Sequence, residues 1–166
     1  MRPMATERQR ELVWEGIFEA ERLHLYYGYL AESLEKWDSR LTLLNLVLSS
    51  GAFAIVLKQW SDPALIAAGA FLAIAVSSFL LVLKRYSRKS VYSAELHRAF
   101  ADLKIEWEAL WSKVDELDSS KLEEEYSRLQ RRAIQLTERA PVELTIDKQI
   151  LDRSDREARE YLGAAA

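Results

Sequence analysis

Two long stretches without a charged residue constrain the fold of this chain more than any other feature. Residues 41–57 read LTLLNLVLSSGAFAIVL, and residues 64–83 read ALIAAGAFLAIAVSSFLLVL. A helix rises about 1.5 Å per residue, so the second stretch spans about 30 Å, which matches the hydrocarbon core of a bilayer. Neither stretch keeps the polar face of a soluble helix, and the rest of the chain is too short to bury both. The pattern predicts a transmembrane hairpin over residues 41–83.

Basic residues beside the two stretches predict how the hairpin is oriented. The connecting loop carries only Lys58, whereas the outer ends carry Lys36, Arg40, Lys84, Arg85, Arg88 and Lys89. Lysine and arginine concentrate on the cytoplasmic side of membrane helices, so we expect both termini in the cytoplasm. The four basic residues after the second stretch, residues 84–89, are expected to contact anionic lipid headgroups.

The remaining sequence predicts helices and no strand, so the expected fold class is all-α. Residues 1–40 predict a cytosolic amphipathic helix that starts near Thr6 and continues into the membrane. Its apolar residues lie on two sides, which favours burial by the C-terminal helices on one side and by another subunit on the other. Residues 140–166 form the C-terminal segment, with a short helix expected over residues 147–162.

Residues 84–139 predict a cytosolic helical hairpin. Its first helix is expected to reach Leu117, and its second to begin with Ser120 as the N-cap and Glu123 completing a capping box. Apolar residues in the first helix are spaced alternately four and three apart, as are the a and d positions of a coiled coil. This seam, a candidate surface for oligomerisation, consists of Leu96, Phe100, Leu103, Trp107, Leu110, Val114 and Leu117.

Small and polar residues inside the two uncharged stretches are the candidates for packing or for a pore. Gly69, Ala73 and Ser77 are four residues apart, a spacing that lets membrane helices approach closely, either within one hairpin or between subunits. Asn45 and Ser49 form a polar strip on the first stretch. An amide that faces lipid is unfavourable, so Asn45 should bond across the hairpin or line a pore in an assembly.

The sequence carries no recognisable catalytic or cofactor-binding motif. It has no cysteine, no glycine-rich phosphate loop and no HExxH or GxSxG motif. His24 and His97 lie on different predicted helices without metal-ligand spacing, so we expect them to be surface or interface residues. A net charge of −3 argues against direct nucleic-acid binding. We therefore expect no enzyme, no cofactor and no metal.

The order of these parts resembles the SMODS and SLOG-associating two-transmembrane effector family, abbreviated SLATT. The resemblance spans roughly residues 14–162, through the stretch RLHLYYGYLAESLEKW, the hairpin and the stretch ELHRAFADLKIEWEALW. It implies an effector in the bacterial inner membrane that accompanies nucleotide-signalling or retron-type antiviral defence systems. Such an effector is expected to form a pore or to disrupt the membrane of the infected cell.

Two functions follow as expectations. Two helices enclose no channel, so a pore needs several copies of the chain around an axis, together with membrane lipids. The trigger would be a partner protein or a nucleotide signal from a neighbouring gene. The alternative is a membrane-tethered scaffold whose cytosolic helices bind and regulate a partner protein.

Overall fold

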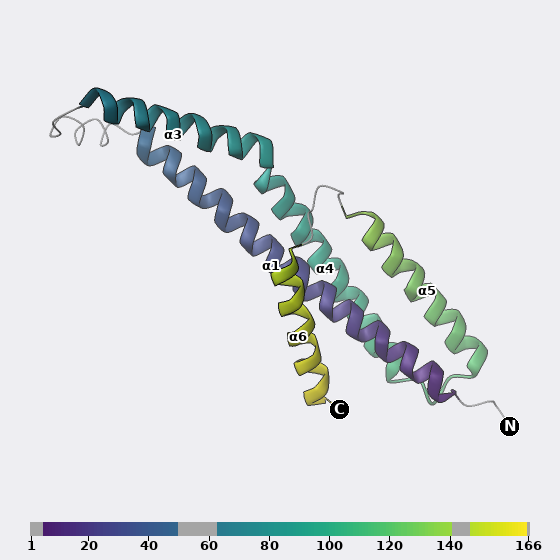
Figure 1. Cartoon of the computed structure of the whole chain (residues 1–166). Coiled ribbons are helices and arrows are strands. Elements are labelled where there is room, and N and C mark those ends of the chain that lie inside the picture. The colour runs from purple at the N-terminus through teal and green to yellow at the C-terminus, as the bar shows by residue number, and fades with distance from the viewer. Residues whose placement is uncertain (1–4, 50–62, 141–146, 166) are drawn as a thin grey trace. The chain divides into compact units, whose positions relative to one another are not determined.

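The computed structural model describes residues 5–49, 63–140 and 147–165, with the side chains of 48–49, 63–67, 81–84 and 164–165 excepted. This part of the chain contains helices and no strand, which confirms the all-α prediction (Figure 1). The helices are α1 (Glu7–Ser49), α3 (Pro63–Lys84), α4 (Tyr86–Trp111), α5 (Ser119–Glu138) and α6 (Lys148–Ala165).

The contacts divide the chain into two compact units. Unit 1 comprises Met1–Ala31 and Val91–Ala166, and unit 2 comprises Glu32–Ser90. Helices α1 and α4 therefore each contribute to both units. The predicted hairpin falls within unit 2, but its residues 50–62 lie outside the described residues.

Helix α1 begins with a reciprocal cap and then runs for 43 residues. The backbone N–H of Gln9 donates to Thr6 Oγ1 at 3.3 Å, and the N–H of Thr6 donates to Gln9 Oε1 at 3.0 Å. These two bonds satisfy donors that the first turn of a helix leaves free. The prediction of one continuous helix from near Thr6 past residue 40 is confirmed.

The core of unit 1 lies between α1, α4, α5 and α6. The Trp107 indole of α4 lies against Gly16 of α1, where an added Cβ would come within 2.8 Å of the ring. Tyr126 of α5 packs edge-on with Trp107, with ring centroids 5.5 Å apart. Apart from Leu117, which is half-buried, the predicted seam is buried in this core: Leu96, Phe100, Leu103, Trp107, Leu110 and Val114. The seam thus packs within the chain.

The connection between α4 and α5 differs from the prediction. Helix α4 ends at Trp111 rather than near Leu117, and the chain then turns through 3₁₀-type bonds from Lys113 N to Leu110 O and from Val114 N to Trp111 O, both 3.1 Å. The N-cap of α5 is Asp118, whose Oδ1 accepts a bond from Lys121 N at 3.0 Å. The prediction of Ser120 as the cap was wrong, because Asp118 lies three residues before the free Lys121 N–H and its carboxylate is a strong cap.

Helices α3 and α4 are separated by one residue with an unusual backbone. Arg85 has a φ of 48°, the one positive φ of a non-glycine residue in the described part of the chain. A left-handed conformation costs an L-residue about 1–2 kcal/mol and ends a right-handed helix. The break therefore stops α3 at Lys84, and α4 begins at Tyr86.

Candidate functional site

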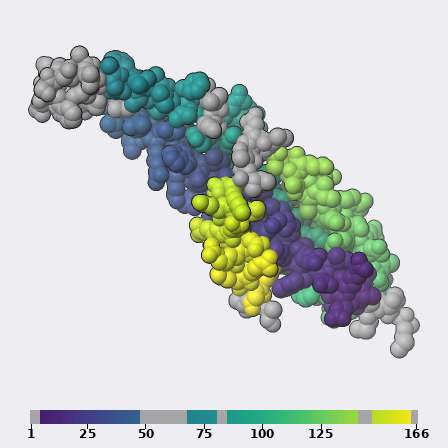
Figure 2. All heavy atoms as spheres, viewed as in Figure 1, coloured from purple at the N-terminus to yellow at the C-terminus, as the bar shows by residue number. Residues whose placement is uncertain are grey.

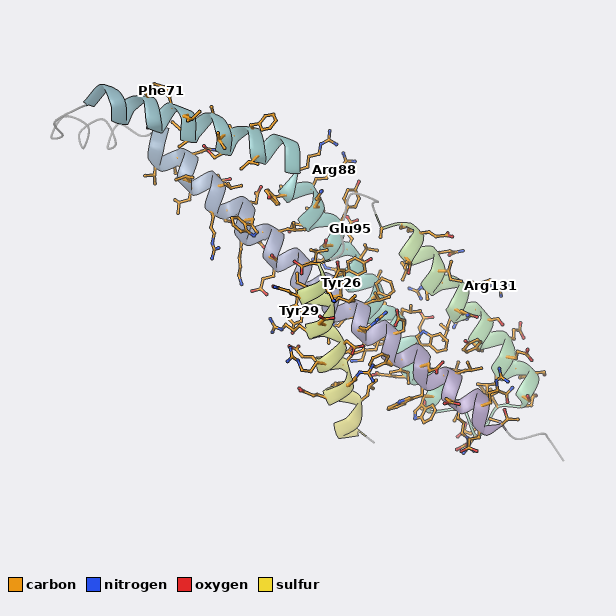
Figure 3. All side chains as sticks on the ribbon, viewed as in Figure 1. Tyr26, Tyr29, Phe71, Arg88, Glu95 and Arg131 are labelled. Carbon is orange, nitrogen blue, oxygen red and sulfur yellow. The ribbon has the colours of Figure 1, made fainter. Side chains whose placement is uncertain are left out.

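Unit 2 exposes large apolar side chains along both of its main helices. Phe71 is 73% exposed and projects from α3 on the side away from α1 (Figure 3). Exposed patches of this kind are rare on soluble monomers and mark contacts with partners or membranes. The exposed residues of this surface are Leu43, Leu44, Leu46 and Val47 on α1, and Phe71, Leu72, Val76 and Phe79 on α3.

Counting only the described residues, no helix combines the length and the apolar character needed to cross a membrane.

The buried contact between α1 and α3 is polar. Ser77 of α3 is 3% exposed, and its hydroxyl lies within donating distance of Asn45 Oδ1 on α1. The same hydroxyl also lies 2.8 Å from Ala73 O and 3.2 Å from Ile74 O. Among the described side chains of the two uncharged stretches, the one that is buried is therefore polar and most of the large apolar ones are exposed, the reverse of a soluble helix pair. The sequence left Asn45 two roles, a bond across the predicted hairpin or a place in the lining of a pore. The bond to Ser77 corresponds to the first of these roles.

The other candidates of the small-residue stripe do not join this contact. No described atom lies within 4 Å of the place where a Cβ on Gly69 would be, and Ala73 is exposed. Ser49 belongs to α1, but its side chain is outside those that the structure describes. Within the described part of unit 2, Gly69 and Ala73 thus leave a surface open to a neighbour.

Basic residues follow the end of α3, as the sequence indicates. Arg85 and Arg88 are exposed and Lys89 is half-buried, while the side chain of Lys84 is outside those described. On α1, the Arg40 guanidinium lies 5.9 Å from the ring centroid of the exposed Trp37. Sequence reasoning counted Arg40 but missed this cation–π pair, although the spacing of three residues on a helix could have indicated it.

In unit 1, a polar cluster holds α6 against α1. The Tyr29 hydroxyl of α1 donates to Glu157 of α6, and Arg153 Nε donates to the same carboxylate at 2.8 Å. The Arg153 guanidinium also lies 4.0 Å from the centroid of the Tyr29 ring. The hydrogen bond with Tyr29, and then that with Arg153, lowers the pKa of Glu157 below its usual 4.5.

The lowered pKa of Glu157 predicts that the attachment of α6 weakens in acid. A carboxyl group whose pKa is lower in the folded state than in the unfolded state stabilises the fold at a pH above its unfolded-state pKa. This contribution is lost as the pH falls through the folded-state pKa. We expect Glu157→Gln to lower the melting temperature at pH 7 and this difference to shrink below pH 4.5. Thermal melts of both proteins at a series of pH values measure the difference. A difference in melting temperature that stays the same down to pH 3 would contradict the prediction.

A second ion pair lies deeper between α1, α4 and α6. Lys104 Nζ lies 2.9 Å from Glu21 Oε2, and both side chains are largely buried. The same ammonium lies 4.0 Å from the centroid of the Tyr161 ring. Burial lowers the pKa of Lys104, but its hydrogen bond with Glu21 and their mutual attraction outweigh burial, so the pKa is raised overall. Removing one partner would leave a buried charge, so the pair fixes the packing of these helices.

The two histidines, which sequence reasoning left apart, meet in the interface between α1 and α4. Their rings stack with centroids 4.0 Å apart and an interplanar angle of 18°. His24 Nδ1 lies 3.0 Å from His97 O, and His97 Nδ1 lies 2.8 Å from His24 O. A carbonyl only accepts, so each Nδ1 carries the hydrogen. Gly28 makes room for this pair, because a Cβ there would lie 2.8 Å from His97 Nδ1.

This pairing makes both histidines interface residues, and nothing around it resembles a metal centre. In the part of the chain that the structure describes, no three histidine, aspartate or glutamate residues gather as metal ligands would. Gly28, one turn after His24, is the residue from which this contact could have been predicted. A glycine inside a helix costs about 1 kcal/mol relative to alanine, so its presence indicates close packing at that position.

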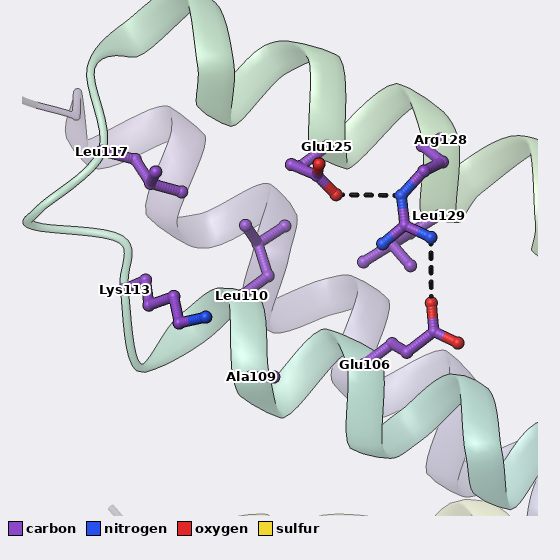
Figure 4. A pocket seen from close by; sticks show the side chains of 8 residues that line it. All are labelled: Glu106, Ala109, Leu110, Lys113, Leu117, Glu125, Arg128 and Leu129. Atoms are coloured by element: carbon purple, nitrogen blue, oxygen red, sulfur yellow. Dashed lines mark hydrogen bonds and ion pairs between the residues drawn. The ribbon is translucent and has the colours of Figure 1, made fainter.

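A hollow of about 300 Å³ lies between α4 and α5 (Figure 4). Arg128 crosses it, with Nη1 3.1 Å from Glu106 of α4 and Nε 2.9 Å from Glu125 of α5. Arg132 also pairs with Glu106. These ion pairs join α4 to α5 across the hollow, which Lys113 also lines.

No protein-family model matches this chain, and neither a curated protein nor a solved structure does.

Proposed function

We propose that this chain is an effector of a bacterial antiviral defence system, of the kind that the SLATT resemblance implies. It is embedded in the inner membrane with both termini in the cytoplasm. When triggered by a partner protein or a nucleotide signal, several copies assemble and form a pore or disrupt the membrane.

The observation that carries the proposal is the inside-out polarity of the two uncharged stretches in unit 2, where Ser77 is the buried side chain among those described. Its helices turn apolar side chains such as Phe71 and Leu46 outward, and they turn the hydroxyl of Ser77 toward Asn45. Lipid is the environment in which such a pair is stable, because polar groups then bond to each other and apolar groups meet acyl chains. The uncharged sequence of residues 64–83 is long enough for one crossing, and that of 41–57 continues beyond the described part of α1.

Gly69 supports assembly between copies. The space beside it is open in the described part of unit 2, so a second hairpin can approach its backbone closely. Asn45 bonds within its own hairpin, so we assign the contact between copies to the face of Gly69 and Ala73 rather than to Asn45.

Expression in bacteria together with the adjacent genes tests the proposal. We expect growth arrest and loss of membrane potential, read with a voltage-sensitive dye. Gly69→Leu should insert normally, because a Cβ at this position has open space around it, yet it should lose toxicity. Phe71→Leu, on the outward face of the same helix, is the matched control and should stay toxic. An unchanged membrane potential under every trigger would refute the proposal.

The separate core of unit 1 favours a second candidate, a membrane-tethered scaffold. Its buried residues come from α1, before the uncharged stretches, and from the three helices that follow them, as Ile17, Phe100, Leu122 and Ala158 show. Such a bundle could bind and regulate a partner while the hairpin serves only as an anchor. Replacing residues 41–83 with an unrelated hairpin separates the two functions, because a scaffold keeps its activity and a pore loses it.

A further inference from the structure

A groove in unit 1 is open on the side of α1 that α6 leaves uncovered. Helix α6 reaches the face of Phe18 and Tyr29, where Arg159 lies 5.1 Å from the Phe18 ring centroid. The groove runs between α1 and α5, which lie next to each other on the face seen in Figure 2. Its floor is formed by Phe100, Leu103 and Trp107 of α4, and its walls include Leu12 and Leu23 of α1 and Ala133 of α5.

The dimensions of the groove favour side chains of another helix over a small molecule. Its volume is about 200 Å³, below the range of about 300–1,000 Å³ for ligand pockets. Its wall on α1 extends from Leu12 to Leu23, which is about three turns of helix. A groove of this length with an apolar floor suits a helix that inserts one or two aliphatic anchors. Glu15 and Glu19 belong to the same wall. Glu19 is paired with Arg22 of α1, so Glu15 is the carboxylate that a cation on the occupant would meet.

The outer face of α4 has the complementary features. Ile105 is 61% exposed and Val91 is also exposed. At about 100° per residue, Arg98 lies within about 20° of Ile105 around the helix, whereas the exposed Asp102 lies about 60° and Glu95 about 80° away. Among the described residues, the side chains of Arg98 and Glu15 form no ion pair or hydrogen bond. The face thus offers an aliphatic anchor beside a free cation.

We propose that the groove of one copy receives Ile105 of a second copy, and that Arg98 of that copy pairs with Glu15. This inference rests on the assembly in the proposed function and names its contact in unit 1. Ile105 is rotated by about 140° from Phe100 in the groove floor, so the two surfaces lie on nearly opposite sides of the same helix. A contact between different surfaces is heterologous, and it closes into a ring when the rotation between neighbours allows.

Disulfide trapping tests the contact, because the chain has no cysteine of its own. Two differently tagged full-length copies, Glu15→Cys and Arg98→Cys, are co-expressed, and their membranes are oxidised with copper–phenanthroline. We expect a crosslinked heterodimer from the mixture and no dimer from either variant alone. Glu124→Cys, exposed on α5, replaces Glu15→Cys as the control and should not crosslink to Arg98→Cys.

Two outcomes would overturn the inference. One is a disulfide between two Arg98→Cys copies without the mixed product, because the contact would then be isologous. The other is the absence of every crosslink. Alkaline carbonate extraction of the same membranes separates this failure from failure of the proposed function, since variants that remain membrane-bound without crosslinking contradict only the groove contact.

Charge reversal gives an independent readout. Glu15→Arg and Arg98→Glu should each reduce the mass of the detergent-solubilised assembly, measured by light scattering, and the double variant should restore it. A double variant that stays as small as the single variants would contradict the pairing.

Discussion

Gly16→Ala is expected to lower the free energy of unfolding of unit 1 by about 2 kcal/mol, because overpacking costs more than the gain in helix propensity. The new Cβ would lie 2.8–2.9 Å from three carbons of the Trp107 indole. Moving the ring aside would disturb its packing, because Trp107 is 3% exposed and meets Tyr126 on another helix. Urea unfolding followed by circular dichroism in detergent measures the change. Gly16→Leu should prevent cooperative unfolding altogether.

The matched control is Gly163→Ala in α6, where no described atom lies within 4 Å of the added Cβ. There the higher helix propensity of alanine should leave stability unchanged or raise it by up to about 1 kcal/mol. In a Trp107→Ala background, which is itself less stable, adding Gly16→Ala should cost nothing further. Equal effects of the two glycine substitutions in the wild-type chain would show that Trp107 does not pack on Gly16.

Ala73→Arg is expected to abolish stable membrane insertion. Ala73 is exposed and lies at the centre of α3, ten residues after Pro63 and eleven before Lys84. An arginine at the centre of a membrane helix costs about 2.5–3.5 kcal/mol, equivalent to a shift of about 100-fold in the insertion equilibrium. Membrane fractions washed with alkaline carbonate, and then quantified by immunoblot, report the inserted fraction.

Ser87→Arg is the control for added charge. Ser87 is exposed and follows Arg85, among residues that are expected at the headgroups, so arginine there should leave insertion unchanged. If Ala73→Arg resisted carbonate as well as the parent chain does, lipid would not surround α3, and the membrane proposal would fail.

The positions of the helices were predictable, because the spacing of apolar residues along many consecutive positions determines where each helix runs. The uncharged stretch 64–83 became α3, and the four-three spacing from Leu96 placed a buried stripe on α4. Helix ends were less predictable. The sequence favoured Ser120 as the N-cap of α5. The backbone geometry shows instead that the helix begins after Asp118, whose side chain accepts the bond from Lys121 N.

Contacts between distant segments were beyond the reach of sequence reasoning. The spacing within each helix indicated that Asn45 and Ser77 were polar residues in apolar surroundings, and a bond across the hairpin was one of two roles considered for Asn45. His24 and His97 gave no such signal, because their contact depends on the register of α1 against α4. That register follows from close approaches at Gly16 and Gly28, which a linear pattern does not display.

Arg85, between α3 and α4, has a left-handed backbone conformation that usually favours glycine. A glycine at position 85 would adopt a φ of 48° without the penalty of about 1–2 kcal/mol that a side chain incurs there. The chain instead carries a guanidinium at the break between the two helices. Grafting this junction elsewhere would therefore transfer a helix break and a positive charge together, whereas an asparagine or a glycine would transfer the break alone.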